Sequence, residues 1–233
     1  MPYTDIISTQ ELKKIIGQPN LVIVDCRFEL SDPNKGKNEY KNAHIPGAFY
    51  ADLNSDLASP ITPQSGRHPL PDDESFSNLL ASWSITRDSQ VVVYDNVGGS
   101  MAVRLWWLLK IFGFENAAVL DGGINRWIKD EFELSNEIPV PAVIKPCAVL
   151  YHANPSLFVT TEEMLELYQN NDYKIIDART TGRYQGKQDP IDAVAGHIPG
   201  AINRFHGENL TEKGVFKSVD VLKSEFTELI GST

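Results

Sequence analysis

The chain has 233 residues, of which 42% are hydrophobic and 22% are charged, and its formal net charge at pH 7 is −10. This composition is typical of a globular protein with one large or two small domains. The acidic balance argues against nucleic acid and anionic membrane surfaces as partners, and no apolar run approaches the ~18 residues of a membrane-spanning helix.

The first part of the chain alternates predicted strands with predicted helices. A short helix opens at Thr9, with Thr9 or Ser8 as its cap and Glu11 in its first turn. The next elements are, in chain order, a buried strand at 21–25, a polar loop, the segment 43–52, a loop rich in Pro, Gly and Ser at 59–72, and an amphipathic helix at 74–83.

Residues 91–113 are predicted to form a strand at 91–94, a turn at 95–100 and a helix at about 101–112. A Gly-rich turn between a strand and a helix builds a cradle of backbone N–H groups that suits an anion. The side chain that points into this cradle is Asp95, a carboxylate and not a thiol. We expect it to accept hydrogen bonds from these N–H groups and to cap the helix, rather than to act as a general base.

The chain continues with a predicted strand at 117–120, a turn and a helix at 124–129, and a Pro-rich segment at 135–146. The pattern then restarts. Its elements are a helix capped by Thr160 or Thr161, the segment 174–179, the segment 196–203 and an amphipathic helix at 219–230.

The second half repeats the first. AHIPGAFY and GHIPGAIN correspond, and Asp25 and His44 recur as Asp177 and His197, at offsets of 152 and 153 residues. The repeat predicts two tandem α/β domains at 1–135 and 155–233, joined by a linker at 136–154. Each is expected to have a central, mostly parallel sheet flanked by helices. Because the second copy lacks a second cradle, we expect it to be incomplete, and the natural chain to have about 280 residues.

Three segments carry a family resemblance: DARTTGRYQG at 177–186, AGHIPGAIN at 195–203 and VLDGGINRW at 119–127. They resemble the tandem-domain rhodanese sulfurtransferases, which include the thiosulfate and 3-mercaptopyruvate enzymes. The resemblance implies transfer of a sulfane sulfur from a small anionic donor to cyanide or a thiol through a Cys persulfide, without a cofactor. It also implies a silent first domain with Asp95 in place of the nucleophile, and a nucleophilic Cys beyond residue 233. The choice between thiosulfate and 3-mercaptopyruvate stays open.

The same resemblance assigns Arg183 to binding of the anionic group of the donor. A fixed bidentate cation suits such a group, and the first copy has 30–32, without an arginine, at about the corresponding place. The alternative is a surface salt bridge from Arg183 to Asp177 or Asp189. Asp177 and Arg179 are predicted to hold their loop as a structural pair, since the first copy repeats them.

His44 and His197 precede the same Ile-Pro-Gly-Ala segment and are expected to pin it by hydrogen bonds rather than to exchange protons. Cys26 and Cys147 are expected to be structural, and with these histidines they match no metal site. Two cysteines so far apart do not form a disulfide framework, and the N-terminus lacks a signal-peptide pattern. The predicted location is therefore the cytoplasm.

Two other functions compete with sulfur transfer. A phosphatase has a related cradle, but it needs a Cys-x5-Arg loop, whereas here the loop begins with Asp95 and the next arginine is Arg104. A catalytically inactive binding or regulatory module that ends at Thr233 is the other alternative.

Overall fold

The computed structural model describes residues 2–140, 149–170, 172–187 and 194–231. Its internal contacts divide the chain into two compact units, Met1–Pro155 and Ser156–Thr233. Cys147 and Asp189 lie outside the described residues, and the predicted domain limits and linker stay a prediction.

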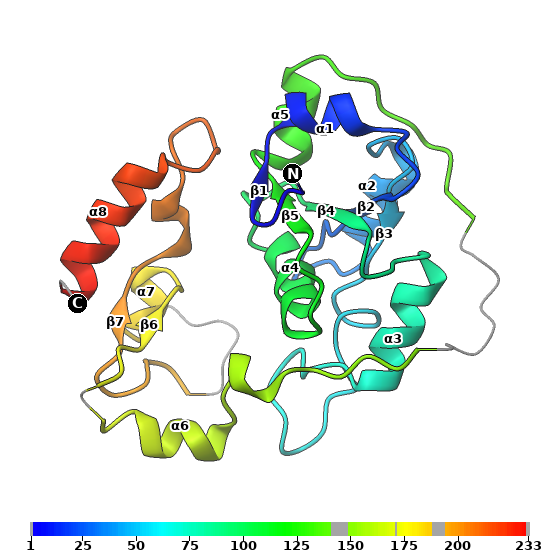
Figure 1. The fold of residues 1–233 in the computed structure, drawn as a ribbon. Helices are drawn as coiled ribbons and strands as arrows, with labels where there is room; N and C mark the ends of the chain where they lie inside the picture. The colour runs from blue at the N-terminus through cyan, green and yellow to red at the C-terminus, as the bar shows by residue number, and fades with distance from the viewer. Residues whose placement is uncertain (1, 141–148, 171, 188–193, 232–233) are drawn as a thin grey trace. The chain divides into compact units, whose positions relative to one another are not determined.

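The first unit is built on a parallel five-stranded sheet with the order β1-β5-β4-β2-β3 (Figure 1). The strands are β1 (Ile6–Ile7), β2 (Leu21–Asp25), β3 (Phe49–Tyr50), β4 (Gln90–Tyr94) and β5 (Ala117–Leu120). β2 and β4 are neighbours along their whole length, from Leu21 opposite Gln90 to Asp25 opposite Tyr94. This pairing confirms the predicted parallel α/β fold at its central strands.

Helices flank this sheet: α1 (Thr9–Ile15), α2 (Lys35–Asn42), α3 (Asp73–Ser82), α4 (Ala102–Ile111) and α5 (Gly123–Lys129). All of them except α2 correspond to predicted helices. Ile23 and Val92 pack in one core cluster with Leu12 of α1 and Trp127 of α5. Alternate residues of a strand point to opposite faces, and β2 and β4 are buried from their second residue to their last. Both faces of the sheet are therefore covered, which explains why these strands are continuous apolar runs.

The start of α1 shows how the sequence fixes a helix end. Ser8, rather than Thr9, is the N-cap, and its side chain accepts a hydrogen bond from the backbone N–H of Glu11. The carboxylate of Glu11 accepts from the backbone N–H of Ser8 in return, which completes a capping box. Of the two expected caps, the structure selects Ser8.

Helix α2 corrects the sequence prediction, which had a polar loop after β2. Its segment KGKNEYKN buries only Gly36 and Tyr40. The sequence therefore lacks the repeating apolar residues by which a helix is predicted. A Cβ atom at Gly36 would lie 1.8 Å from the carbonyl oxygen of Arg27. The absence of a side chain at Gly36 therefore lets α2 lie directly against the loop that follows β2.

The turn η1 (Pro155–Leu157) begins at the last residue of the first unit. The second unit contains α6 (Thr161–Leu167), β6 (Ile176–Asp177), α7 (Thr181–Tyr184), β7 (Ile202–Asn203), η2 (His206–Asn209) and α8 (Val219–Ile230). β6 and β7 are parallel, with Asp177 opposite Asn203, just as β2 and β3 place Asp25 opposite Tyr50. The predicted repeat is therefore confirmed in the backbone register. In the described part of this unit the sheet has these two strands, and no strand pairs with the other edge of β6.

None of the helices in the described ranges combines the length and the apolar character that crossing a membrane requires.

Candidate functional site

The cradle between β4 and α4 is filled by the carboxylate of Asp95. This side chain is buried and accepts four hydrogen bonds from backbone N–H groups of its own turn and of the helix start. Its Oδ1 receives those of Val97 and Gly99, each at 2.9 Å, and its Oδ2 receives those of Met101 at 2.8 Å and Ala102 at 2.9 Å. The expectation that this carboxylate accepts hydrogen bonds from the N–H groups of the cradle is confirmed, although the N-cap residue of α4 itself is Met101 and not Asp95.

The backbone of Asp95 is held as firmly as its side chain. Its carbonyl oxygen accepts a hydrogen bond of 3.0 Å from the N–H of Ile124, at the start of α5. Gly123 has a φ of +55°, and a Cβ there would lie 2.1 Å from the same carbonyl oxygen. The DGG turn thus lets a second helix start directly against the first residue of the cradle.

An aspartate–arginine pair locks the loop after the second strand. Arg27 binds Asp25 through Nε, at 3.1 and 3.0 Å from the two carboxylate oxygens, and through Nη2 at 2.7 Å from Oδ2. Burial acts to lower the pKa of Arg27, but the hydrogen bonds and the charge of Asp25 outweigh it, so that pKa is raised. The hydroxyl of Tyr94 donates to the same carboxylate at 2.8 Å. The pair therefore also ties β2 to β4.

The second unit repeats this pair. Arg179 Nε lies 3.1 Å from each carboxylate oxygen of Asp177, and Nη2 lies 2.7 Å from Oδ2. The remaining Nη2 hydrogen bond goes to the carbonyl of Gly196, next to His197. The hydrogen bond from Arg179 lowers the pKa of Asp177 against the opposing effect of burial.

A tyrosine–histidine stack also recurs in both units. The rings of Tyr40 and His44 stack at 4.2 Å, and the tyrosine hydroxyl donates to the carbonyl of Ala48 at 2.8 Å. His44 Nδ1 lies 2.7 Å from the Tyr40 carbonyl. His44 Nε2 lies 3.1 Å from the carbonyl of Glu137, which connects the Ile-Pro-Gly-Ala loop to the start of the Pro-rich segment.

In the second unit, the rings of Tyr184 and His197 stack at 3.7 Å. The hydroxyl of Tyr184 donates to Ala201 at 2.8 Å, and His197 Nδ1 lies 2.7 Å from the Tyr184 carbonyl. Both histidines thus contact the backbone, in the way expected of side chains that pin a loop.

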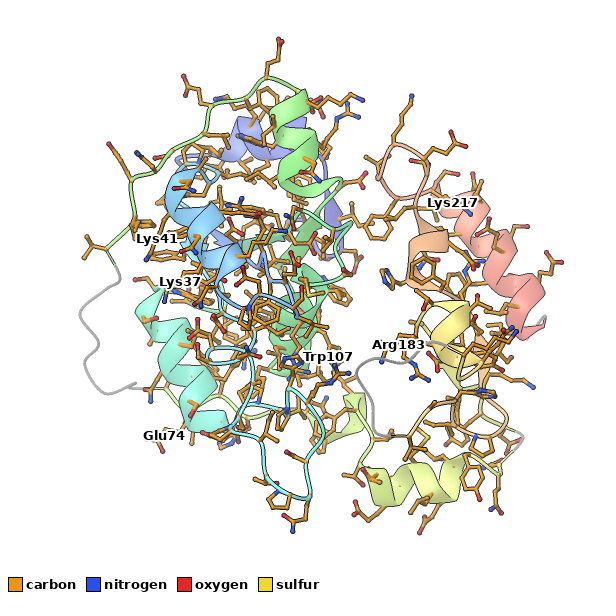
Figure 2. The ribbon with its side chains drawn as sticks, turned by 180° about the vertical axis from the view of Figure 1, so that it is seen from behind. Lys37, Lys41, Glu74, Trp107, Arg183 and Lys217 are labelled. Atoms are coloured by element: carbon orange, nitrogen blue, oxygen red, sulfur yellow. The ribbon has the colours of Figure 1, made fainter. Side chains whose placement is uncertain are left out.

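These stacks change the alignment of the two copies at Arg183. Tyr184 occupies the place of Tyr40, so the residue before it, Arg183, corresponds to Glu39. The sequence comparison had placed 30–32 there, which is wrong. Arg183 lies in α7 and is partly buried (Figure 2). The same position therefore carries a negative charge in the first unit and a positive charge in the second.

Both halves of the chain match the sequence model of the Rhodanese-like domain, at residues 8–130 and 160–228. The chain belongs to the rhodanese-like family. The protein of Pseudomonas aeruginosa named "Probable 3-mercaptopyruvate sulfurtransferase" is 35% identical over 99% of this chain and 81% of its own length. Thiosulfate sulfurtransferase of Bos taurus is 33% identical over 96% of this chain and 76% of its own length. Among solved structures, the 3-mercaptopyruvate sulfotransferase SseA of Escherichia coli matches with a TM-score of 0.83 and 29% identity, covering 99% of this chain and 85% of SseA.

Cys26, the cysteine that the structure describes, lies outside the cradle of Asp95. Cys26 is buried at the end of β2, and its Sγ lies 3.9 Å from the carbonyl oxygen of Val24. Burial, followed by the charges of Asp25 and Asp95, raises the pKa of this thiol well above its usual value. Its environment therefore opposes formation of a thiolate, in line with the expected structural role.

Arg104 has a role that the sequence did not reveal. It is a partly buried cation whose guanidinium donates to the carbonyls of Leu57, His68 and Pro69 at 2.9–3.2 Å. It therefore fastens the loop rich in Pro, Gly and Ser to α4. These contacts do not favour the phosphatase alternative, in which an arginine of the loop itself must bind the phosphate.

Proposed function

We propose that this chain forms the greater part of a sulfurtransferase that moves a sulfane sulfur from thiosulfate or 3-mercaptopyruvate to cyanide or a thiol. The names of the relatives support this reaction class. The observation that carries the proposal to individual residues is the charge reversal between the two units. The second unit repeats the aspartate–arginine pair and the tyrosine–histidine stack of the first, but it has Arg183 where the first has Glu39. A guanidinium at this position suits an anionic donor.

The nucleophile is proposed to lie beyond residue 233, on the loop that follows the strand next to β6. In the first unit, the corresponding strand β4 leads into the cradle at Asp95. A Cys thiolate at that point attacks the outer sulfur of thiosulfate, the S–S bond breaks, and sulfite leaves with the electron pair. The acceptor then takes the outer sulfur from the Cys persulfide and returns the thiolate. Backbone N–H groups stabilise the anionic sulfur in both steps, and no cofactor takes part.

Within this scheme Asp177, Arg179 and His197 are positioning residues. Arg179 connects the end of β6 to the backbone at Gly196, and His197 contacts the backbone of Tyr184. Arg183 is the residue immediately before that tyrosine. The three residues therefore support the segment that presents Arg183 to a donor.

The partners follow from the same proposal: a small anionic donor and a thiol or cyanide acceptor, and neither nucleic acid nor a membrane, given the net charge of −10. We propose a cytoplasmic location, which the free thiol of Cys26 supports because a reducing compartment preserves thiols.

The proposal is tested by cyanide-dependent release of thiocyanate from thiosulfate. The 233-residue chain is expected to release none, because Asp95 fills its one described cradle and repels an anionic donor. Asp95→Cys is expected to reach weak activity at best, since Glu39 still faces the donor. A longer chain, continued beyond residue 233 through a strand, a Cys loop and a helix, is expected to catalyse the reaction. After exposure to thiosulfate without an acceptor, its mass is expected to increase by that of one sulfur atom.

Two results would contradict the proposal. Turnover by the unmodified 233-residue chain that is lost in Cys26→Ser or Cys147→Ser would place the nucleophile elsewhere. An inactive continued chain, folded and carrying its Cys, would favour the alternative of a catalytically inactive binding or regulatory module.

Arg183→Ala in the continued chain is expected to lower kcat/KM for the donor by about 10- to 100-fold, because a bidentate charge-assisted contact contributes roughly 1.5–3 kcal/mol. Steady-state kinetics with thiosulfate and with 3-mercaptopyruvate measures the effect. Lys187→Ala removes the same charge from an exposed position four residues away and serves as the control. Equal kcat/KM for the two variants would assign Arg183 to a surface ion pair instead.

A further inference from the structure

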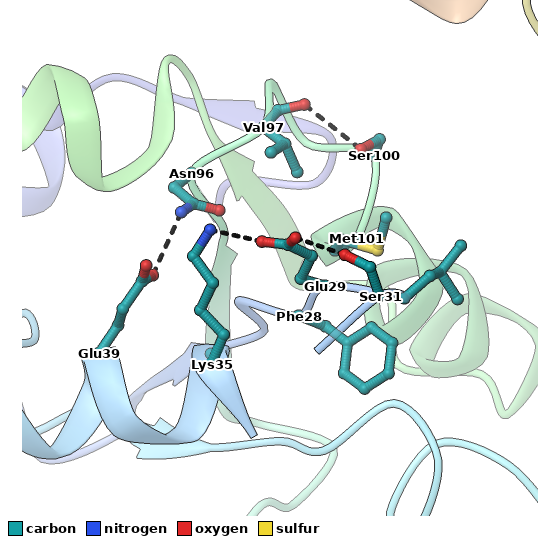
Figure 3. A pocket seen from close by; sticks show the side chains of 11 residues that line it. Phe28, Glu29, Ser31, Lys35, Glu39, Asn96, Val97, Ser100 and Met101 are labelled. Carbon is teal, nitrogen blue, oxygen red and sulfur yellow. Dashed lines mark hydrogen bonds and ion pairs between the residues drawn. The ribbon is translucent and has the colours of Figure 1, made fainter. Parts of the chain in front are cut away.

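The first unit contains a cavity of about 430 Å³ beside the filled cradle. Figure 3 shows its three walls: the loop after β2, the first turns of α2, and the turn that leads into α4. The apolar side chains of its lining are those of Phe28, Leu30, Val97 and Met101. Leu30 and Val97 are 45% and 46% exposed and present apolar surface at the cavity. The cavity therefore offers a hydrocarbon-binding surface that the protein itself leaves uncovered.

The charged side chains of the cavity are Glu29, Lys35 and Glu39. Glu29 and Lys35 form an ion pair with each other, and Ser31 donates a further hydrogen bond of 2.5 Å to Glu29. Glu39 stands one turn after Lys35 on α2 and points toward Asn96 (Figure 3). The paired charges cancel, so Glu39 gives the cavity its net negative charge.

Glu39 is weakly engaged for a carboxylate. Its Oε2 accepts a hydrogen bond of 3.3 Å from Asn96 Nδ2 and lies 3.8 Å from Arg27 Nη1. Its Oε1 accepts no hydrogen bond from any residue that the structure describes, and the side chain is 34% exposed. One oxygen therefore remains open to a donor from solution.

The groups that would bind an anion here are already used. The four N–H groups of the cradle donate to Asp95. The guanidinium of Arg27 donates to Asp25 and to the carbonyl of Ala43. Lys35 is held by Glu29. An anion at this cavity would meet Glu39 without gaining any of these donors, and burial of such an unpaired charge is unfavourable.

We propose that this cavity binds a small organic cation, a primary ammonium on a short hydrocarbon body, with the ammonium on Glu39 and the hydrocarbon on Leu30 and Val97. The first unit is then a cation-binding counterpart of the second, produced by the exchange of arginine for glutamate at one position of the repeat. This inference concerns the first unit and does not depend on sulfur transfer.

The test titrates the 233-residue chain with three probes while its amide resonances are followed by NMR. The probes are n-butylammonium, pentanoate, which carries a similar hydrocarbon with the opposite charge, and thiosulfate. Butylammonium is expected to shift the amide signals of Glu39, Asn96 and Val97 in a saturable way. Pentanoate and thiosulfate are expected to leave them in place. Equal binding of butylammonium and pentanoate would overturn the proposal.

Two substitutions on α2 are expected to act in opposite directions. Glu39→Gln removes the open carboxylate and should weaken butylammonium binding by about fivefold. Lys35→Gln removes the competing cation and should strengthen it. Glu74→Gln is the matched control for charge, because this exposed residue of α3 does not line the cavity (Figure 2).

The amide spectrum of each variant reports its fold in the same experiment, and the probe series on the unsubstituted chain stands if a variant does not fold. Butylammonium binding that Glu39→Gln and Glu74→Gln reduce equally would show a general effect of net charge and would refute the assigned site. Shifts that do not saturate with butylammonium would do the same.

Discussion

Replacement of Asp95 by leucine is expected to lower the free energy of unfolding of the first unit by about 3–5 kcal/mol. Four backbone N–H groups donate to this carboxylate, and leucine offers them no acceptor. Each buried donor without a partner costs about 1–3 kcal/mol, and water can reach part of the turn and reduce the sum. Denaturant unfolding followed by tryptophan fluorescence measures the change, since all four tryptophans lie before residue 128.

The control for this substitution is Asp88→Leu. Asp88 is exposed in the turn before β4, and its replacement is expected to change stability by no more than about 0.5 kcal/mol. If Asp95→Leu unfolded at the same denaturant concentration as Asp88→Leu, the cradle would not depend on its carboxylate.

Asp25→Ala is expected to destabilise the first unit by about 3–5 kcal/mol, because it leaves the charge of Arg27 buried without its main partner. The side chains of Asp25 and Arg27 are 0% and 7% exposed. The substitution also removes the acceptor of the Tyr94 hydroxyl, whose pKa is raised well above the usual value mainly by burial. Hydrogen exchange at the amides of β2 reports the loss of stability.

The repeat supplies the matched control. Asp177→Ala breaks the corresponding pair in the second unit, where Asp177 and Arg179 are 12% and 27% exposed. Water can solvate Arg179 after the change, so a cost of about 1 kcal/mol is expected at the amides of β6. An equal loss of stability in the two units would mean that burial does not determine how much the aspartate–arginine pair contributes.

The sequence predicts the elements of this fold that bury a continuous apolar run or stripe. β2 and β4 are recognisable because both of their faces are covered, and α3 because Phe76 and Leu80 recur at helical spacing. The strands β1, β3, β6 and β7 have two residues each and are too short to show any periodicity. Helix α2 is hidden by its polar composition, since a close approach of backbones at Gly36 positions it rather than an apolar stripe.

The sequence likewise predicts one part of the candidate site and not another. The role of Asp95 follows from its residue type and its place in a Gly-rich turn. The correspondence of Glu39 with Arg183 does not follow from counting residues. Tyr40 precedes His44 by 4 residues, whereas Tyr184 precedes His197 by 13. The second unit therefore has an insertion between its tyrosine and its histidine. The contacts of Tyr40 and Tyr184 restore the alignment in three dimensions.

The pairing of β1 with β5 bears on how the protein is made. Ile6 lies opposite Val119 and Ile7 opposite Leu120, so one edge of the sheet joins the beginning of the first unit to a segment synthesised much later. Until that segment leaves the ribosome, Ile7 lacks the neighbour that buries it, although it is 0% exposed in the finished unit. Such late pairing between distant segments slows folding and leaves apolar surface open to chaperones in the interval. A ribosome that stalled before residue 117 would therefore hold a chain whose first strand has no partner.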